Sequence, residues 1–96
     1  MGDNMNIILY FSDQQRYDTI NENVTPNIES MADDSIFFDN AFTCQPVCGP
    51  ARACIQTGLY ASQNRCYING ISMDKSDDDT LAKVLNRNGY NTSYIG

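Results

Sequence analysis

The first strong structural signal along the chain is the apolar stretch Asn6-Ile7-Ile8-Leu9-Tyr10-Phe11-Ser12. Its apolar residues follow one another without alternation, which is typical of a strand buried on both faces of a parallel sheet. The stretch is far too short to span a bilayer, and it ends abruptly at the polar turn that contains Asp13. We therefore expect it to be a central strand of an α/β fold.

Three helices are predicted downstream, each with apolar residues at helical spacing: residues 25–34, 50–58 and 80–88. Thr25 and Pro26 resemble an N-cap followed by a proline at the first helical position, and Gly58 is placed as a C-terminal stop. Acidic residues 77–79 precede the last helix and would compensate its positive end, with a metal cluster as the alternative. Short strands are predicted at residues 36–38 and 90–95. This order of elements predicts a mostly parallel sheet flanked by helices.

The composition is that of a small globular domain and excludes several functional classes. The chain has 96 residues, of which 42% are hydrophobic and 19% are charged. Its net charge of -6 disfavours a nucleic-acid binder and a polybasic membrane-surface protein, because both need basic residues. There is no histidine, so the chain itself lacks the base of a Ser-His-Asp or Cys-His mechanism. The N-terminal residues lack the basic region of a signal peptide, which predicts a cytoplasmic protein.

The cysteines are predicted to be reduced thiols rather than a disulfide framework, as expected for a cytoplasmic chain. They form no C-x-x-C pair, so a zinc site is only weakly indicated. The four positions are Cys44, Cys48, Cys54 and Cys66. Three of them are assigned packing or loop roles, and Cys48 is the exception.

The segment from Cys44 to Gly58 carries the densest chemical information. Cys48 is predicted just before a helix N-terminus, where unpaired N–H groups and the helix dipole favour negative charge. Arg52 follows four residues later, so the helix would bring its guanidinium to the same side. A nucleophile, a positive helix end and a fixed cation would together form a pocket for a tetrahedral oxyanion. The alternative is a buried structural thiol beside a surface arginine.

The same segment resembles the signature of the sulfatase family, which is C-x-P-x-R followed by T-G. Here the matching residues are Cys48, Pro50 and Arg52, with Thr57 and Gly58 beyond them. Further resemblances follow in the family's order: Asn6 to Asp13, Thr25-Pro26-Asn27-Ile28, Phe38-Asp39-Asn40-Ala41-Phe42, Thr80 to Tyr90 and Tyr94-Ile95-Gly96. The resemblance therefore covers nearly the whole chain.

This resemblance implies a role for four positions. Cys48 stands where the family's cysteine is oxidised to formylglycine, whose hydrate is the nucleophile. Arg52 stands where an arginine holds that hydrate. Asp13 and Gln14 match metal-binding positions, and one hydroxyl of the hydrate at position 48 would also contact the metal. Gln14 replaces a commoner aspartate with a neutral oxygen ligand, and Ca²⁺ or another divalent cation accepts both kinds of oxygen.

The resemblance also implies a fold and an activity. The fold would be the N-terminal part of an alkaline-phosphatase-like α/β sandwich, with residues 1–96 an incomplete portion of the catalytic domain. A Lys-x-His motif would follow Gly96, and further metal ligands would lie downstream. The implied activity is hydrolysis of a sulfate ester, after modification by a formylglycine-generating or sulfatase-maturing enzyme and without nucleic-acid or membrane partners. The alternatives are a phosphonate monoester or phosphodiester hydrolase of the same superfamily, or an inactive fragment, and these residues alone are expected to be inactive.

Four other polar residues are candidates for the mouth of the pocket: Arg16, Asp18, Arg65 and Asn69. The sequence offers a second interpretation for each, as an ordinary solvated loop residue.

Overall fold

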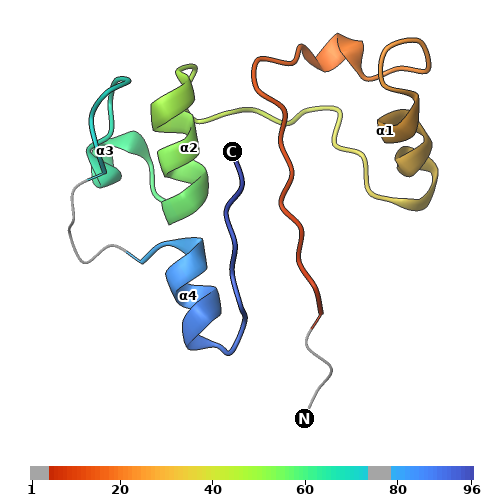
Figure 1. Ribbon diagram of the computed structural model, residues 1–96. Coiled ribbons are helices and arrows are strands. Elements are labelled where there is room, and N and C mark those ends of the chain that lie inside the picture. The colour runs from red at the N-terminus through yellow and green to blue at the C-terminus, as the bar shows by residue number, and fades with distance from the viewer. Residues whose placement is uncertain (1–4, 74–78) are drawn as a thin grey trace. The chain divides into compact units, whose positions relative to one another are not determined.

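The computed structural model describes residues 5–73 and 79–96 (Figure 1). The chain divides into two compact units. The first unit is Asn6–Phe42, and the second is formed by the described residues of Thr43–Gly96 together with Met5. Helices are the regular elements of both units in the described part of the chain.

The first unit contains the short helix α1, Pro26–Met31, between two 3₁₀ helices, Tyr17–Thr19 and Ala32–Asp34. The predicted helix at residues 25–34 is thus confirmed, with a tighter final turn. Pro26 begins α1 because its fixed φ suits the first turn and its missing N–H is not needed there. The Thr25 hydroxyl does not cap the helix. It accepts from the Asn21 N–H at 3.2 Å and donates to the Thr19 carbonyl at 3.1 Å, which ties α1 to the preceding loop.

The second unit contains α2, Cys48–Thr57, the four-residue helix α3, Ala61–Asn64, and α4, Leu81–Arg87. Helix α2 packs against both α3 and α4. Gly58 ends α2 as predicted, because its φ of 68° is left-handed and its N–H bonds the Cys54 carbonyl at 2.8 Å. Helix α4 also lies where the sequence places it, with the Thr80 hydroxyl accepting from the Lys83 N–H at 3.3 Å.

Helix α2 begins two residues earlier than predicted, at Cys48 rather than at Pro50. The first helical hydrogen bond runs from the Ala51 N–H to the Val47 carbonyl at 2.9 Å. Pro50 therefore sits within the first turn, where a residue has no intrahelical N–H bond to lose. Cys48 is thus the first helical residue rather than the residue before the helix.

The core of the second unit is small and is made of small side chains. Its buried residues are Pro50, Ala53, Cys54, Ala61, Asn64 and Cys66. Asn64 is 3% exposed, and its Nδ2 lies 3.3 Å from the Leu59 carbonyl, 3.4 Å from Thr57 Oγ1 and 3.6 Å from Cys54 Sγ. Its Oδ1 accepts from the Cys66 N–H at 2.9 Å. One buried amide therefore connects α2, α3 and the chain that follows α3.

The predicted sheet is not confirmed, because residues 5–73 and 79–96 contain no strand. The segments predicted as strands run as irregular chain (Figure 1). Their apolar side chains are open to solvent: Ile8 is 91% exposed, Ile36 80% and Ile95 96%. A strand exists only when its N–H and C=O groups pair with a neighbouring strand, and these segments find no such neighbour among the described residues. Within the same residues, no helix is long and apolar enough to cross a membrane.

The acidic run before α4 is described only in part, since Asp77 and Asp78 lie outside the described residues. Asp79 forms an ion pair with Arg87 in the last turn of α4, with Oδ2 2.6 Å from Nη2. The hydrogen bond to Arg87 holds the pKa of the Asp79 carboxyl below its ordinary value and raises the pKa of Arg87. Asp79, the described residue of this acidic segment, therefore pairs with a residue of α4 itself.

Candidate functional site

The N-terminus of α2 places Cys48 at the surface of the second unit. Val47 is extended, with φ -116° and ψ 134°, and the chain turns into the helix immediately after it. Helical hydrogen bonds begin only at Ala51, so the N–H groups of Cys48 and Gly49 have no partner within the helix. Such N–H groups carry the positive end of the helix dipole, which favours negative charge beside residue 48. The Cys48 thiol is exposed, which excludes the alternative of a buried structural thiol.

Arg52 lies one turn further along α2 and is partly buried. Residues four apart on a helix lie on one face, so α2 presents Cys48 and Arg52 on the same side. Both residues come from one continuous helix, which fixes their spacing. The structure thus places Cys48 and Arg52 four positions apart on one helix, and their catalytic roles stay a prediction.

Asn69 is a site residue whose importance the sequence did not reveal. Its Nδ2 donates to Cys48 Sγ at 3.2 Å, and its Oδ1 accepts from the Gly49 N–H at 2.8 Å. The thiol also lies 3.4 Å from Asn69 Oδ1. Asn69 is 21 residues away from Cys48, so no helical or strand spacing connects the two. The sequence named Asn69 as a candidate for the mouth of the pocket, with an ordinary loop residue as the alternative, but it gave no sign of the contact with Cys48.

Asp13 and Gln14 lie in the first unit and are both exposed. Gln14 has a φ of 54°, a left-handed conformation that is uncommon for residues other than glycine. Such conformations concentrate at ligand and active sites. A metal site that joins these two residues with Cys48 stays a prediction, since Cys48 and Arg52 belong to the second unit.

The donor set that this chain offers fits part of a hard-cation site. Asp13 brings a carboxylate and Gln14 a neutral amide oxygen, and both are ligands that Ca²⁺ accepts. Ca²⁺ takes about six to eight oxygens, so two side chains account for only a fraction of its shell. No group of three or more His, Cys, Asp and Glu residues in the described ranges could hold a metal by itself.

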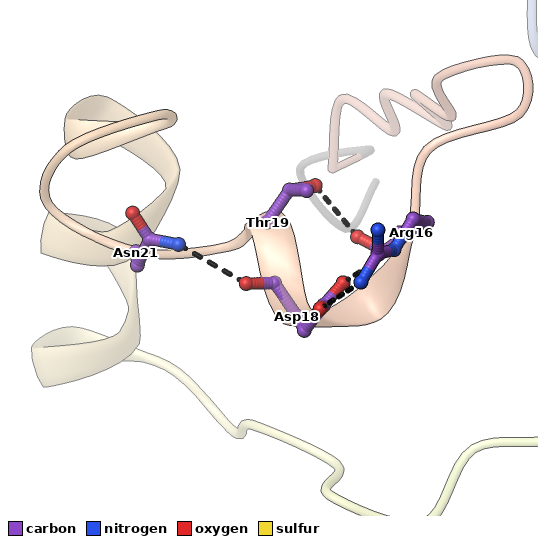
Figure 2. A network of polar contacts seen from close by, with 4 residues as sticks. All are labelled: Arg16, Asp18, Thr19 and Asn21. Atoms are coloured by element: carbon purple, nitrogen blue, oxygen red, sulfur yellow. Dashed lines mark hydrogen bonds and ion pairs between the residues drawn. The ribbon is translucent and has the colours of Figure 1, made fainter.

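Two other candidates, Arg16 and Asp18, hold their own loop together (Figure 2). Arg16 Nε donates to Asp18 Oδ1 at 3.0 Å, and its Nη2 pairs with the second carboxylate oxygen. The Thr19 hydroxyl donates to the Arg16 carbonyl at 2.6 Å, and Asn21 Nδ2 donates to the Asp18 carbonyl at 3.1 Å. Both charged groups are exposed and satisfied within the loop, so the solvated-loop interpretation is the one that the structure favours.

Arg65 has a local role at the end of α3. Its φ of 61° is left-handed, and its N–H bonds the Ala61 carbonyl at 2.9 Å, which ends the helix. Its side chain is exposed. The backbone at position 65 is therefore needed to turn the chain toward Cys66 and Asn69.

All four cysteines are free thiols, as predicted. Cys54 and Cys66 are buried and pack in the core. A side-chain hydrogen bond with Cys54 raises the pKa of the Cys44 thiol. A raised pKa keeps that thiol protonated and less nucleophilic at neutral pH, although Cys44 is exposed like Cys48.

Comparison with known proteins identifies the class to which this arrangement belongs. A family model described as Sulfatase matches residues 5–96. The chain belongs to the sulfatase family, which implies the alkaline-phosphatase-like α/β fold. As a family, sulfatases use a formylglycine and a divalent cation. No solved structure matches the chain.

The chain is also similar in sequence to individual proteins. The chain is 43% identical over 72 residues to an uncharacterized sulfatase, YidJ, of Escherichia coli, covering 75% of this chain and 14% of that protein. It is 37% identical over 98 residues to an arylsulfatase of Clostridium perfringens, covering 95% of this chain and 20% of that protein. It is 33% identical over 101 residues to a multifunctional alkaline phosphatase superfamily protein, PehA, of Trinickia caryophylli, covering 95% of this chain and 20% of that protein. The chain thus spans a fifth or less of the length of these relatives.

Proposed function

We propose that this chain is the N-terminal portion of the catalytic domain of a sulfuric ester hydrolase, in which residue 48 is the nucleophile. The observation that carries the proposal is the position of Cys48. Its exposed side chain stands at the first residue of α2, with Arg52 one turn further on the same helix. Family membership supports the same assignment, and the signature residues Cys48, Pro50 and Arg52 all belong to this one helix.

The nucleophile would be formylglycine made from Cys48 by a maturing enzyme. Its hydrate supplies two hydroxyls, one to attack the sulfur of a sulfate ester and one whose deprotonation later releases sulfate. Residues of this chain would set the electrostatic environment of that hydrate. The positive end of the α2 dipole and the Arg52 guanidinium would both oppose the negative charge that builds up on the sulfate oxygens. Because both are fixed on one helix, they need no rearrangement when that charge develops.

Asp13 and Gln14 would hold the divalent cation, which we propose to be Ca²⁺. The cation supplies Lewis-acid chemistry to the sulfate group. The oxygen chemistry of the two side chains and the left-handed backbone of Gln14 support this proposal. A neutral ligand at position 14 leaves more positive charge on the cation than a second carboxylate would.

The test compares turnover of an aryl sulfate by the full-length enzyme, by Cys48→Ala and by Cys44→Ala. Cys48→Ala removes the precursor of the nucleophile and should abolish turnover. Cys44→Ala removes another exposed thiol from the same unit and should leave turnover within about twofold, as expected for a change away from the reacting atoms. Wild-type turnover by Cys48→Ala would exclude residue 48 as the nucleophile.

A second candidate activity is hydrolysis of phosphonate monoesters or phosphodiesters. This second activity is supported by the similarity to the multifunctional alkaline phosphatase superfamily protein of Trinickia caryophylli. The same helix end and guanidinium would serve a phosphoryl group, which is also tetrahedral and anionic. Measuring kcat/KM for an aryl sulfate and an aryl phosphodiester with the same leaving group separates the two activities, since the larger value identifies the preferred ester.

A further inference from the structure

We infer that Asn69 is a positioning residue, which uses one side-chain amide to fix the side chain of residue 48 against the start of α2. This inference rests on the proposed function of residue 48. It is carried by two contacts of the same amide: Oδ1 lies 2.8 Å from the Gly49 nitrogen, and Nδ2 lies 3.2 Å from Cys48 Sγ.

The first contact determines the second. An asparagine amide has a carbonyl oxygen that accepts and an NH₂ group that donates. The Gly49 N–H is one of the helix-start donors without an intrahelical partner, so it requires the acceptor end of the amide. With Oδ1 held there, Nδ2 is left facing Cys48 Sγ. The orientation of the amide is therefore set by the backbone of α2, and its donor is directed at residue 48.

Gly49 is required for this approach. A Cβ built on Gly49 would lie 2.7 Å from Asn69 Oδ1, closer than real Cβ contacts come. Any larger residue at position 49 must push the amide away from the helix. On the other side, Gly70 follows Asn69 with a φ of 87°, which glycine adopts without strain. Two glycines thus let a loop amide reach the helix end.

The contact is not a by-product of core packing, because Cys48 and Asn69 are both exposed. The buried amide of the same unit, at Asn64, already connects α2 to α3. Once Cys48 is converted, oxygen atoms replace sulfur on the same carbon. The Asn69 donor would then hold one hydroxyl and leave the other for attack, which reduces the number of unproductive orientations.

A double-mutant cycle in the full-length enzyme tests this role. Asn69→Ala removes the amide, whereas Gly49→Ala displaces the amide without altering Asn69 or any charge. Each single variant should lower kcat by about 10- to 100-fold, as expected for a misplaced reacting group. KM should stay within about twofold, since the loss falls on the reacting geometry rather than on uniform binding. The double variant should lose no more than either single variant, because both remove the same contact.

Two measurements distinguish positioning from a purely structural effect. Gly49→Ala should keep or raise the melting temperature, because alanine is the better helix former, although kcat falls. Crystal structures of the unconverted protein should show Cys48 Sγ in one rotamer in the wild type and in more than one in Asn69→Ala. Asn91→Ala, an exposed asparagine of the same unit, is the matched control. Conversion of Cys48 is checked by mass in every variant.

The outcomes separate this inference from the proposed function. An active wild type with unchanged kcat in Asn69→Ala and a single Cys48 rotamer would overturn the positioning role. An inactive wild type whose Cys48 rotamer still depends on Asn69 would overturn the proposed function and support the positioning role. Independent losses that multiply in the double variant would show that Gly49 and Asn69 do not act through one contact.

Discussion

At the scale of single residues, the chain contains a natural control for the modification of Cys48. Cys44 and Cys48 are both exposed thiols of the second unit, and each is followed two positions later by a proline. Only Cys48 has an arginine at the fourth position after it; Cys44 has Cys48 there. A maturing enzyme that recognises C-x-P-x-R should therefore modify only one of the two.

This difference predicts the outcome of co-expression with a formylglycine-generating system. Peptide mass analysis should show a loss of about 18 Da at Cys48, the difference between a thiol side chain and an aldehyde. Cys44 should keep its mass, and Arg52→Ala should reduce conversion at Cys48. If Cys48 retained its thiol under conditions that convert a control sulfatase, the proposed nucleophile would be wrong.

The second prediction at this scale concerns Asp13. In the full-length enzyme, Asp13→Asn removes a charge that faces a divalent cation, and it should weaken Ca²⁺ binding and lower turnover by about 100-fold or more. Gln14→Asp adds a charge and should bind Ca²⁺ at least as tightly. That variant need not turn over faster, because a more neutralised cation polarises sulfate less.

Calorimetric titration of Ca²⁺ into metal-stripped protein, followed by activity measurement, checks this prediction. Asp39→Asn is the control, because Asp39 is an exposed carboxylate of the same unit. Metal affinity and turnover at the wild-type level in Asp13→Asn would show that Asp13 is an ordinary loop residue.

At the scale of elements, the position of α2 depends on the buried Asn64 amide. This amide bonds Thr57 and Leu59 at the end of α2 and receives the Cys66 N–H from the chain after α3. Asn64→Ala would leave the Cys66 N–H buried without a partner. Losing such a partner costs about 1–3 kcal/mol.

We therefore expect the Asn64→Ala variant of the full-length enzyme to lose about 1–3 kcal/mol in the free energy of unfolding. Denaturant unfolding followed by circular dichroism measures the loss, and the exposed Asn91→Ala serves as the control. Turnover at low temperature should persist, because Asn64 contacts Cys54 and Thr57 in the C-terminal half of α2, whereas Cys48 is its first residue. Unchanged stability would mean that the core of this unit does not depend on the amide.

At the scale of the whole molecule, many large apolar side chains of the described residues are exposed. They include those of the segments that the sequence predicts as strands, such as residues 6–12 and 36–38, which stay open to solvent in the structure. Exposed apolar stretches of this kind favour association with other chains. Small chains also bury a limited share of their surface on folding.

The isolated 96-residue chain should accordingly lack a sharp, cooperative thermal transition and should associate with itself. Circular dichroism during heating, combined with sedimentation velocity, tests both expectations. The full-length enzyme is the comparison and should melt cooperatively. A monomer of the isolated chain that melts sharply would show that these residues form a self-sufficient domain.

Features that depend on neighbouring residues could be predicted from the amino-acid sequence. Pro26, Gly58 and Thr80 begin or end helices where predicted, because caps and left-handed stops act within one turn. The placement of Cys48 and Arg52 on one side of a helix could also be predicted, since residues four apart on a helix lie on one face. The start of α2 was misplaced by two residues, because Pro50 fits the first turn at more than one position.

Contacts that depend on the folded chain could not be predicted from the sequence. Asn69 meets Cys48 across 21 positions of sequence, and no periodicity encodes such a contact. Asn64 stands between the polar residues Gln63 and Arg65, yet it is buried and has four hydrogen-bond partners. The predicted strands are the reverse case: their apolar pattern is clear, but a strand needs hydrogen bonds from a neighbour. The residues described here do not provide that neighbour, because pairing depends on the surrounding fold and not on the strand's own sequence.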